Sequence, residues 1–354
     1  MRAINHSFSH GAETPHSRLF ALLYVDSTNQ TALAVRPGSF GAPTAKQQVS
    51  TFRSIQPRPI DRGTTSIQGE FLVPPPIPLP SEFMKLVTFQ LPDSAAEAGI
   101  LENDRVFPLG ADMLTVIESG RLPLPGPTSF ALGEVKLLAP IPRPPKLICA
   151  GLNYRDHAAE VKLEIPKIPT IFNKFTNVVI GPGDPIVLPK VESRPDYEAE
   201  FAFVIGRGGR YIPASKAMQH VFGYTILNDV SARDFQMATS QWLMGKTFDT
   251  FAPMGPWIVT AEEIQDPHAL DISLEIAGVT LQHSNTRELI FKIPELIEHI
   301  SKVVTLEPGD VVATGTPAGV GFARKPPRYL KPGDEVIIRV EGIGELRNPV
   351  TAEA

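Results

Sequence analysis

Two acidic side chains, one residue apart, are the first feature of the sequence that could perform chemistry. Glu198 and Glu200 lie in the largely apolar segment Asp196–Gly206, which predicts a β-strand. Because side chains alternate along a strand, both carboxylates should point to the same face. Neighbouring carboxylates repel each other unless water solvates them or a cation lies between them. Taken alone, the pair is more typical of a solvated edge strand than of a metal site.

A third carboxylate follows the next predicted strand. Asp229 lies at the tip of the strand Tyr224–Leu227, after Asn228, and before a helix start that Ser231 and Asp234 would cap. Strand ends beside helix starts are common places for ligands, although Asp229 could also be a plain turn residue. Three carboxylates without a nearby Cys or His predict oxygen coordination. Such a site selects Mg²⁺, Mn²⁺ or Ca²⁺ over zinc or copper.

A histidine and a glutamate could supply a base. His157 and Glu160 follow Asn153, which could cap a short helix there. At a spacing of three they share one helix face and can form a hydrogen bond. A carboxylate that orients an imidazole is the usual way to prepare a general base. From spacing alone, an exposed pair of no consequence is the more common outcome.

Three further polar side chains could contact a substrate. Arg233 and Gln236 share a face of the predicted helix Ala232–Leu243, where Arg233 could equally form a surface ion pair. Lys246 lies in the apolar run Trp242–Phe248. A lysine in such a run usually extends to solvent, but it could project into a site and stabilise developing negative charge.

The elements that must hold these side chains are mostly strands. The predicted strands include Phe201–Ile205, Tyr224–Leu227, Val311–Ala313 and Val336–Val340, and the predicted helices are Ala232–Leu243 and Ile293–Val303. Pro-Gly-Asp turns at 308–310 and 332–334 each precede a β-branched strand. The pattern predicts a β-rich α+β fold without alternating βαβ units.

The composition divides the chain into three parts. Residues 1–83 carry a net charge of +2 within a total of −5, and Pro74–Pro80 has five prolines in seven residues. A strand pattern begins after Met84. We therefore predict an extension over 1–83, a small N-terminal domain over 84–142 and a catalytic domain over 143–354. The extension is either disordered or a targeting segment, so we expect a cytoplasmic protein, or a mitochondrial one if 1–83 is a transit segment.

Several classes of function are disfavoured. The acidic net charge and the lack of a basic patch argue against nucleic-acid partners. The sequence contains no run of 18 apolar residues, so it predicts no membrane span. The single cysteine, Cys149, excludes a disulfide within the chain and a cysteine-based zinc cluster. The motifs of serine hydrolases, zinc proteases and nucleotide-binding loops are also missing.

Five motifs occur in an order that resembles the fumarylacetoacetate hydrolase family. They are Gly151–Tyr154 with His157 and Glu160, Tyr197–Glu200, Asn228–Asp234, Gly245–Phe251 and Thr314–Gly321. The resemblance covers about residues 84–350. The tail Arg324–Val336 is most similar to the fumarylacetoacetate hydrolase domain-containing protein 2 group within that family.

The resemblance implies a fold, a metal and a set of roles. The fold would be a mixed β-sandwich roll, often dimeric, with a small N-terminal domain. The metal, Mg²⁺ or another divalent ion, would bind Glu198, Glu200 and Asp229. The catalytic residues would be His157, Glu160 and Lys246, and the substrate-contacting residues Arg233, Gln236 and Thr316.

These expectations predict a metal-dependent enzyme acting on a small 2-oxo or 1,3-dioxo carboxylic acid, assembled as a homodimer. We expect C–C hydrolysis of an acylpyruvate or fumarylacetoacetate-like substrate, with His157 activating water and Lys246 stabilising the oxyanion. Arg233 would bind a substrate carboxylate. The same residues would serve an oxaloacetate-type decarboxylase, or an isomerase or hydratase of aromatic catabolism. A catalytically weak binding protein with the same fold is the alternative from another class.

Overall fold

The computed structural model describes residues 84–354. The predicted extension over 1–83 lies outside the described residues. Within residues 84–354, no helix is long and apolar enough to cross a membrane. Strands make up most of the regular structure, as the proline-rich and β-branched sequence predicts.

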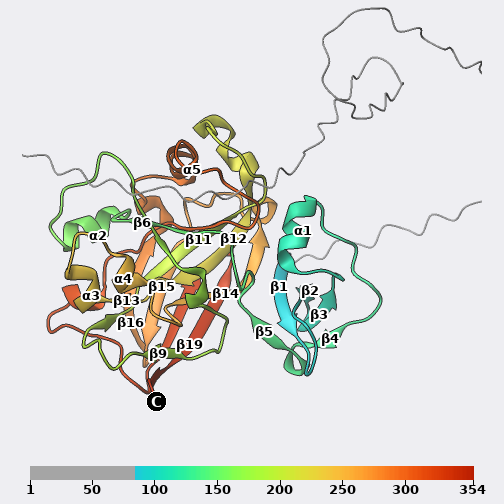
Figure 1. Cartoon of the computed structure of the whole chain (residues 1–354), viewed down its shortest axis with the longest axis horizontal. Helices are drawn as coiled ribbons and strands as arrows, with labels where there is room; N and C mark the ends of the chain where they lie inside the picture. The colour runs from blue at the N-terminus through green and yellow to red at the C-terminus, as the bar shows by residue number, and fades with distance from the viewer. Residues whose placement is uncertain (1–83) are drawn as a thin grey trace, which may run out of the picture. The chain divides into compact units, whose positions relative to one another are not determined.

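The largest element is a 12-stranded sheet with the order β4-β3-β2-β1-β14-β12-β11-β17-β6-β7, to which β5 and β8 add at the side (Figure 1). Its strands are β1 (Lys85–Gln90), β2 (Glu97–Glu102), β3 (Arg105–Pro108), β4 (Phe130–Ala131), β5 (Lys136–Leu138), β6 (Leu147–Gly151), β7 (Thr170–Lys174), β8 (Val179–Ile180), β11 (Ala199–Ile205), β12 (Val221–Asn228), β14 (Ala252–Thr260) and β17 (Val311–Ala313). The pairs β6–β17 and β8–β14 are parallel and the others antiparallel, so the sheet is mixed.

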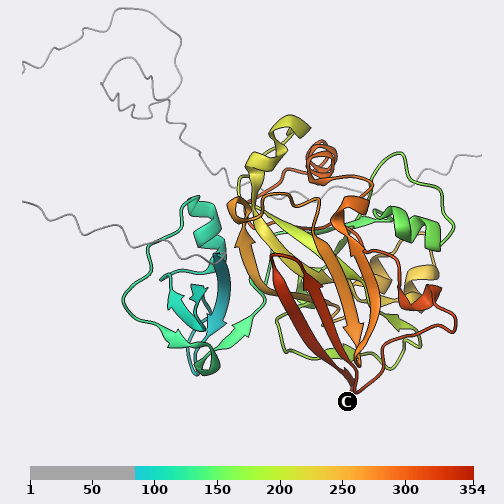
Figure 2. The ribbon, with the colours of Figure 1, turned by 180° about the vertical axis from the view of Figure 1, so that it is seen from behind.

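A second sheet of five strands has the order β16-β15-β18-β19-β9. Its strands are β9 (Ile186–Leu188), β15 (Asp271–Ile276), β16 (Val279–Asn285), β18 (Glu335–Val340) and β19 (Gly344–Ala352). Figure 2 shows its orange and red strands lying over the yellow and green strands of the first sheet, and β15 and β18 contact β11 and β12. A short pair joins β10 (Pro195–Asp196) to β13 (Ser231–Ala232). The prediction of a β-rich α+β protein built as a mixed β-sandwich is confirmed.

Strand β11 lies in the interior of the large sheet, between β12 and β17. Its apolar face contributes Phe201 and Phe203 to the core, with Tyr224 of β12 stacked on Phe201 at a ring distance of 5.2 Å. Every residue of β11 is buried. The prediction of a solvated edge strand is therefore wrong, and the carboxylates of Glu198 and Glu200 are buried.

The helices are short and lie outside the sheets. They are α1 (Met113–Ser119), α2 (Arg155–Glu160), α3 (Arg233–Met237), α4 (Leu243–Lys246) and α5 (Ile293–Ser301). The 3₁₀ turns are η1 (Leu132–Glu134), η2 (Thr176–Val178), η3 (Ala214–His220), η4 (Ala261–Glu263), η5 (Thr286–Glu288) and η6 (Gly321–Ala323). Helix α5 confirms the predicted helix, although it ends two residues before Val303.

The single helix predicted over Ala232–Leu243 is wrong, because the chain breaks it into α3 and α4. The Thr239 hydroxyl bonds to the backbone of Gln241, which offers the chain a local alternative to the helix. The break lets α4 fold back onto α3. At the contact, a Cβ on Gly245 would lie 2.4 Å from the backbone nitrogen of Gln236, so only glycine fits.

Residues 84–142 continue the large sheet. Strand β1 pairs with β14 through Lys85 and Leu86, opposite Val259 and Ile258. Its own apolar cluster includes Val87, Phe89, Leu101 and Val106. A separate cluster and a shared sheet are both present, so the division into domains at residue 142 stays a prediction.

Candidate active site

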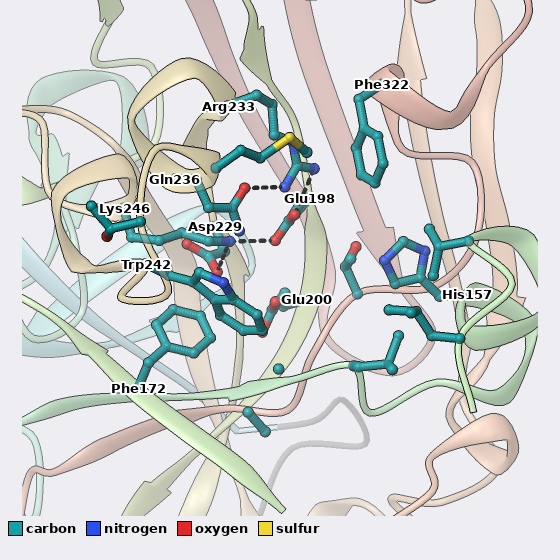
Figure 3. A pocket seen from close by; sticks show the side chains of 18 residues that line it. His157, Phe172, Glu198, Glu200, Asp229, Arg233, Gln236, Trp242, Lys246 and Phe322 are labelled. Atoms are coloured by element: carbon teal, nitrogen blue, oxygen red, sulfur yellow. Dashed lines mark hydrogen bonds and ion pairs between the residues drawn. The ribbon is translucent and has the colours of Figure 1, made fainter. Parts of the chain in front are cut away.

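Eight of the nine predicted site residues line one pocket of about 480 Å³, shown in Figure 3. The ninth, Glu160, contacts the pocket through His157. The side chains come from α2, from β11 and the residue before it, from the residue after β12, from α3 and α4, and from the loop after β17. Apolar side chains including Leu163, Phe172 and Trp242 form much of the remaining wall.

Pairing of β11 with β12 brings the three carboxylates together. Ala199 lies opposite Asn228, so Glu198 and Asp229 meet just beyond the paired ends. The Asp229 N–H donates to the Glu198 carbonyl at 2.9 Å. One oxygen from each of Glu198, Glu200 and Asp229 lies within 4.8 Å of the others, and all three residues are buried. Strand alternation predicted the proximity of Glu198 and Glu200, and the pairing of β11 with β12 adds Asp229.

Three buried cations surround these carboxylates. Lys246 Nζ lies 2.7 Å from Glu198 and 2.6 Å from Asp229. Lys174 Nζ at the end of β7 lies 2.6 Å from the other oxygen of Asp229. Arg233 Nη2 lies 2.7 Å from Glu198. Lys246 therefore projects into the site and does not extend to solvent.

The cations are shared unequally among the carboxylates. Burial raises the pKa of Glu198, but Lys246 and Arg233 outweigh burial and hold it at about 2. Glu200 pairs with no cation among the described residues, and its Oε2 accepts only the Gly315 N–H at 2.8 Å. Burial, followed by repulsion from Asp229 and Glu198, raises the Glu200 pKa well above its usual value.

This imbalance tests whether the residues fit a metal ion. Buried carboxylates without a paired positive charge are costly, and a cation beside Glu200 would remove that cost. The donors are three carboxylate oxygens with no sulfur or imidazole in the cluster. Such a donor set suits a hard divalent cation. The cluster can therefore hold a metal, and the chemistry of its donors does not select among Mg²⁺, Mn²⁺ and Ca²⁺.

The predicted base is already paired with its carboxylate. His157 Nδ1 lies 2.9 Å from Glu160 Oε2, and the Gly319 N–H donates to Glu160 Oε1 at 2.9 Å. Because a carboxylate accepts, we assign the proton to Nδ1, which leaves Nε2 as the ring nitrogen available to a ligand. Figure 3 shows His157 on the side of the pocket opposite Lys246. His157 is 9% exposed, so an exposed pair is wrong.

Asn153 does not cap this helix as predicted. The N-cap position belongs to Tyr154, which makes no side-chain cap hydrogen bond. The Asn153 amide instead bonds to both backbone groups of Phe291 and to the Thr314 carbonyl. An amide with four polar positions serves better as a buried cross-link, and here it fixes α2 against the loop after β17.

Arg233 and Gln236 share a helix face as predicted. Arg233 Nη1 donates to Gln236 Oε1 at 2.7 Å, so the Gln236 amine remains as a donor for a ligand. The guanidinium also pairs with the buried Asp196 at 2.9 Å and lies 4.5 Å from the ring centre of Phe322. A substrate carboxylate would have to compete with Asp196 and Glu198 for this cation.

Thr316 lines the pocket, but its hydroxyl is engaged elsewhere. It donates to the Ala199 carbonyl at 2.9 Å and accepts from Gln282 Nε2 at 2.9 Å. Sequence reasoning missed Gln282, Asp196 and Lys174. Lys174 comes two residues after the short β-branched and aromatic pair Ile171-Phe172, and a lysine at the end of such a strand-like segment was the signal that could have revealed it.

Two family models match the chain. Residues 146–351 match the model described as "Fumarylacetoacetate (FAA) hydrolase C-terminal", and residues 84–140 match "Rv2993c-like, N-terminal". The first match spans all nine predicted site residues. It covers more than half of the 354-residue chain.

Individual proteins agree with this match. Oxaloacetate tautomerase FAHD2A, mitochondrial, from Bos taurus is 44% identical over 292 residues, which cover 77% of this chain and 93% of the relative. The solved 5-carboxymethyl-2-hydroxymuconate delta-isomerase from Mycobacterium smegmatis is 40% identical with a TM-score of 0.67, covering 76% of this chain and 100% of that chain. Fumarylacetoacetate hydrolase from Exiguobacterium antarcticum is 37% identical with a TM-score of 0.69, with the same two coverages. The chain therefore belongs to the fumarylacetoacetate hydrolase family.

Proposed function

We propose that this protein is a divalent-metal-dependent enzyme that interconverts the keto and enol forms of a small 2-oxo dicarboxylic acid such as oxaloacetate. The observation that carries the proposal is one pocket with the His157–Glu160 pair on one wall and the carboxylate–lysine cluster on the other. A keto–enol exchange needs a single base and a cationic site for the developing oxyanion. The Bos taurus relative's name, oxaloacetate tautomerase, favours the same reaction.

The base acts at the carbon next to the oxo group. Glu160 holds Nδ1–H, so Nε2 of His157 removes a proton from that carbon and returns one to the oxygen or the carbon. The imidazolium that forms is stabilised by the same carboxylate. Glu160 is itself fixed by the Gly319 N–H, which keeps the imidazole in one orientation.

Negative charge develops on the oxo oxygen during this transfer. A divalent ion held by Glu198, Glu200 and Asp229 would supply positive charge at the carboxylate wall. Burial lowers the pKa of Lys246, but Asp229 and Glu198 outweigh burial and raise it, so the side chain stays an ammonium. It supplies a fixed positive charge for the reacting oxygen from a side chain that is 2% exposed.

The substrate carboxylates need donors on the chain. The Gln236 amine is turned away from Arg233 and can donate to one of them. Arg233 could bind the other, in competition with Asp196 and Glu198 for the same guanidinium. Thr316 can contact the substrate as part of the pocket wall, whereas its hydroxyl proton already bonds to the Ala199 carbonyl.

Hydrolysis of a C–C bond, the reaction first expected from the sequence, is the second candidate. The same Nε2 of His157 could remove a proton from water. The name of the Exiguobacterium antarcticum structure, fumarylacetoacetate hydrolase, favours it. Decarboxylation of oxaloacetate is a third relative of the reaction, and it releases carbon dioxide without requiring the base.

One panel of assays separates these reactions. The purified protein is mixed with freshly dissolved enol oxaloacetate, with and without Mg²⁺, and the decay of the conjugated enol is followed by ultraviolet absorbance. Metal without protein is the control, because Mg²⁺ alone promotes enolisation. Parallel samples measure carbon dioxide release and the cleavage of acetylpyruvate and fumarylacetoacetate.

We expect enol decay to be accelerated well above the metal control, without carbon dioxide. Cleavage of acetylpyruvate or fumarylacetoacetate alone would instead support the hydrolase. If every substrate stays unchanged while metal is bound, the protein is better described as a catalytically weak binding protein of the same fold.

Four further properties belong to the same proposal. We infer Mg²⁺ as the metal, a homodimer as the assembly, and a catalytic domain over 143–354 preceded by a small domain over 84–142. We also infer a mitochondrial location in place of the expected cytoplasmic one, since the Bos taurus relative carries that word in its name. Imaging of a tagged full-length protein in cells would test the location, and light scattering would test the assembly.

A further inference from the structure

A single buried glutamine joins the two walls of the pocket. Gln282 lies on β16, in the second sheet, and is 1% exposed. Its Oε1 accepts the Ala199 N–H at 2.9 Å, which fixes which end of the amide is oxygen. Its Nε2 donates to Thr316 Oγ1 at 2.9 Å and to the Pro317 carbonyl at 2.8 Å. Gln282 itself does not line the pocket.

The first of these contacts fixes the carboxylate wall. Ala199 lies between Glu198 and Glu200, so its backbone sets the height of both carboxylates along β11. Because β11 belongs to the large sheet and β16 to the small one, the Gln282 contact ties the two sheets at the metal ligands. A shift of β16 relative to β11 would move these ligands.

The other two contacts fix the loop 314–319, which holds both halves of the site. At one end of the loop, the Gly315 N–H donates to Glu200 at 2.8 Å. At the other end, the Gly319 N–H donates to Glu160 at 2.9 Å. One loop thus positions a proposed metal ligand and the partner of the proposed base, and Gln282 bonds to its middle.

The backbone of β16 supports the same loop directly. Gly319 has a φ of +106°, and a Cβ there would lie 2.1 Å from the Leu281 carbonyl oxygen. Farther along β16, Ser284 Oγ donates to Asp156 at 2.5 Å, next to His157 on α2. Strand β16 therefore contacts the metal wall, the loop and the helix of the base within four residues.

We propose that Gln282 is a positioning residue that sets the carboxylate cluster and the His157–Glu160 pair at their working separation, an inference that rests on the proposed function. It touches neither substrate nor metal. It acts through Ala199 on one side and through the loop 314–319 on the other. Loss of its bonds should weaken metal binding and slow proton transfer together.

The test compares Gln282→Met with Gln282→Glu and with a matched control. Gln282→Met keeps the side-chain volume and removes all three hydrogen bonds. Gln282→Glu keeps the acceptor for Ala199 and removes both donors to the loop. The control is Asn348→Leu: Asn348 is 2% exposed on β19 of the same sheet and donates to the Gly181 and Asp184 carbonyls at 2.8 and 2.9 Å, away from the site.

Three quantities are measured for each full-length variant: the thermal midpoint, the dissociation constant for Mn²⁺ by calorimetry, and kcat for oxaloacetate enol decay. Both Gln282 variants should weaken Mn²⁺ binding and lower kcat, each by roughly 10–100-fold, as for other groups that orient ligands from behind. Asn348→Leu should lower the thermal midpoint and leave the other two values within about twofold of the unchanged protein.

Unchanged Mn²⁺ affinity and kcat in a folded Gln282→Met protein would overturn the proposal, as would equal losses in Asn348→Leu. If Gln282→Met does not fold, Gln282→Glu decides in its place. Failure of the proposed function is distinguishable, because it would show as inactivity of the unchanged protein. The Mn²⁺ affinities would still report whether Gln282 positions the carboxylates.

Discussion

The Glu160→Gln substitution tests the proposed base most directly. The Glu160 carboxylate accepts two N–H donors, His157 Nδ1 and the Gly319 backbone, each at 2.9 Å. The two donors reach different oxygens of the carboxylate, and a glutamine side chain has an oxygen at only one of these positions. If its oxygen stays with His157, its amine opposes the Gly319 N–H, and a donor loses its partner at a cost of about 1–3 kcal/mol.

The glutamine avoids that cost by bonding to Gly319 and turning its amine toward His157. The imidazole then moves its proton from Nδ1 to Nε2, where it faces the pocket and cannot act as a base. The wrong tautomer and the loss of the negative charge beside the imidazolium should together raise the activation barrier by about 3–5 kcal/mol. This increase lowers kcat by roughly 10²–10⁴-fold. Mn²⁺ affinity should hold, because Glu160 contacts none of the three clustered carboxylates.

Stopped-flow absorbance of oxaloacetate enol decay, at saturating Mn²⁺, measures the effect. Glu164→Gln is the matched control, since it makes the same change at an exposed position four residues along the chain. A Glu160→Gln protein with unchanged kcat would refute the assignment of the base. An equal loss in Glu164→Gln would show that the effect is not specific to the pair.

Three further outcomes are expected. Glu200→Gln should abolish the rise in thermal midpoint that Mg²⁺ produces and should not lower the metal-free midpoint, because it removes a buried carboxylate that pairs with no cation in residues 84–354. A Mg²⁺ effect that persists in differential scanning fluorimetry would contradict this. Lys246→Met should lower kcat by roughly 10²–10³-fold, because the positive charge for the developing oxyanion is lost. Mg²⁺ should bind at least as tightly, because a cation that competes for Glu198 and Asp229 is gone. Weaker Mg²⁺ binding by calorimetry would count against this role of Lys246. A shortened protein beginning at Met84 should keep its thermal midpoint and turnover, since β1 already pairs within the large sheet; insolubility or a fall of several kcal/mol in unfolding free energy would show otherwise.

The fold could be predicted where local sequence and tertiary packing agree. The strands β11, β12, β17 and β18 were identified from apolar and β-branched runs beside Gly, Pro and Asp turns. Their pairing order was not predictable, because β17 pairs with β6, more than 150 residues earlier in the chain. The helix over 232–243 failed for a related reason, since its break depends on α4 packing back against Gln236.

In the candidate site, too, the local relations between residues could be predicted from the sequence and the tertiary ones could not. Strand alternation correctly placed Glu198 beside Glu200, and the i, i+3 spacing correctly paired His157 with Glu160. Both relations are local. That these two pairs share one pocket followed from the family resemblance, because no residue spacing reports the separation between α2 and β11.

Lys174 shows why buried charges are the hardest part of the site to predict. Its position at the end of an edge strand is typical of a solvated lysine, yet Asp229 and the Val230 carbonyl bind its ammonium and the side chain is buried. Burial lowers the pKa of Lys174, and Asp229 opposes that effect. The free-energy cost of burying the Lys174 ammonium is offset only because Asp229 lies within hydrogen-bond distance. This proximity depends on strands distant in sequence that bring β7 and β12 together. The complete sheet therefore determines which buried charges pair with each other, and local sequence around a single residue cannot predict the pairing.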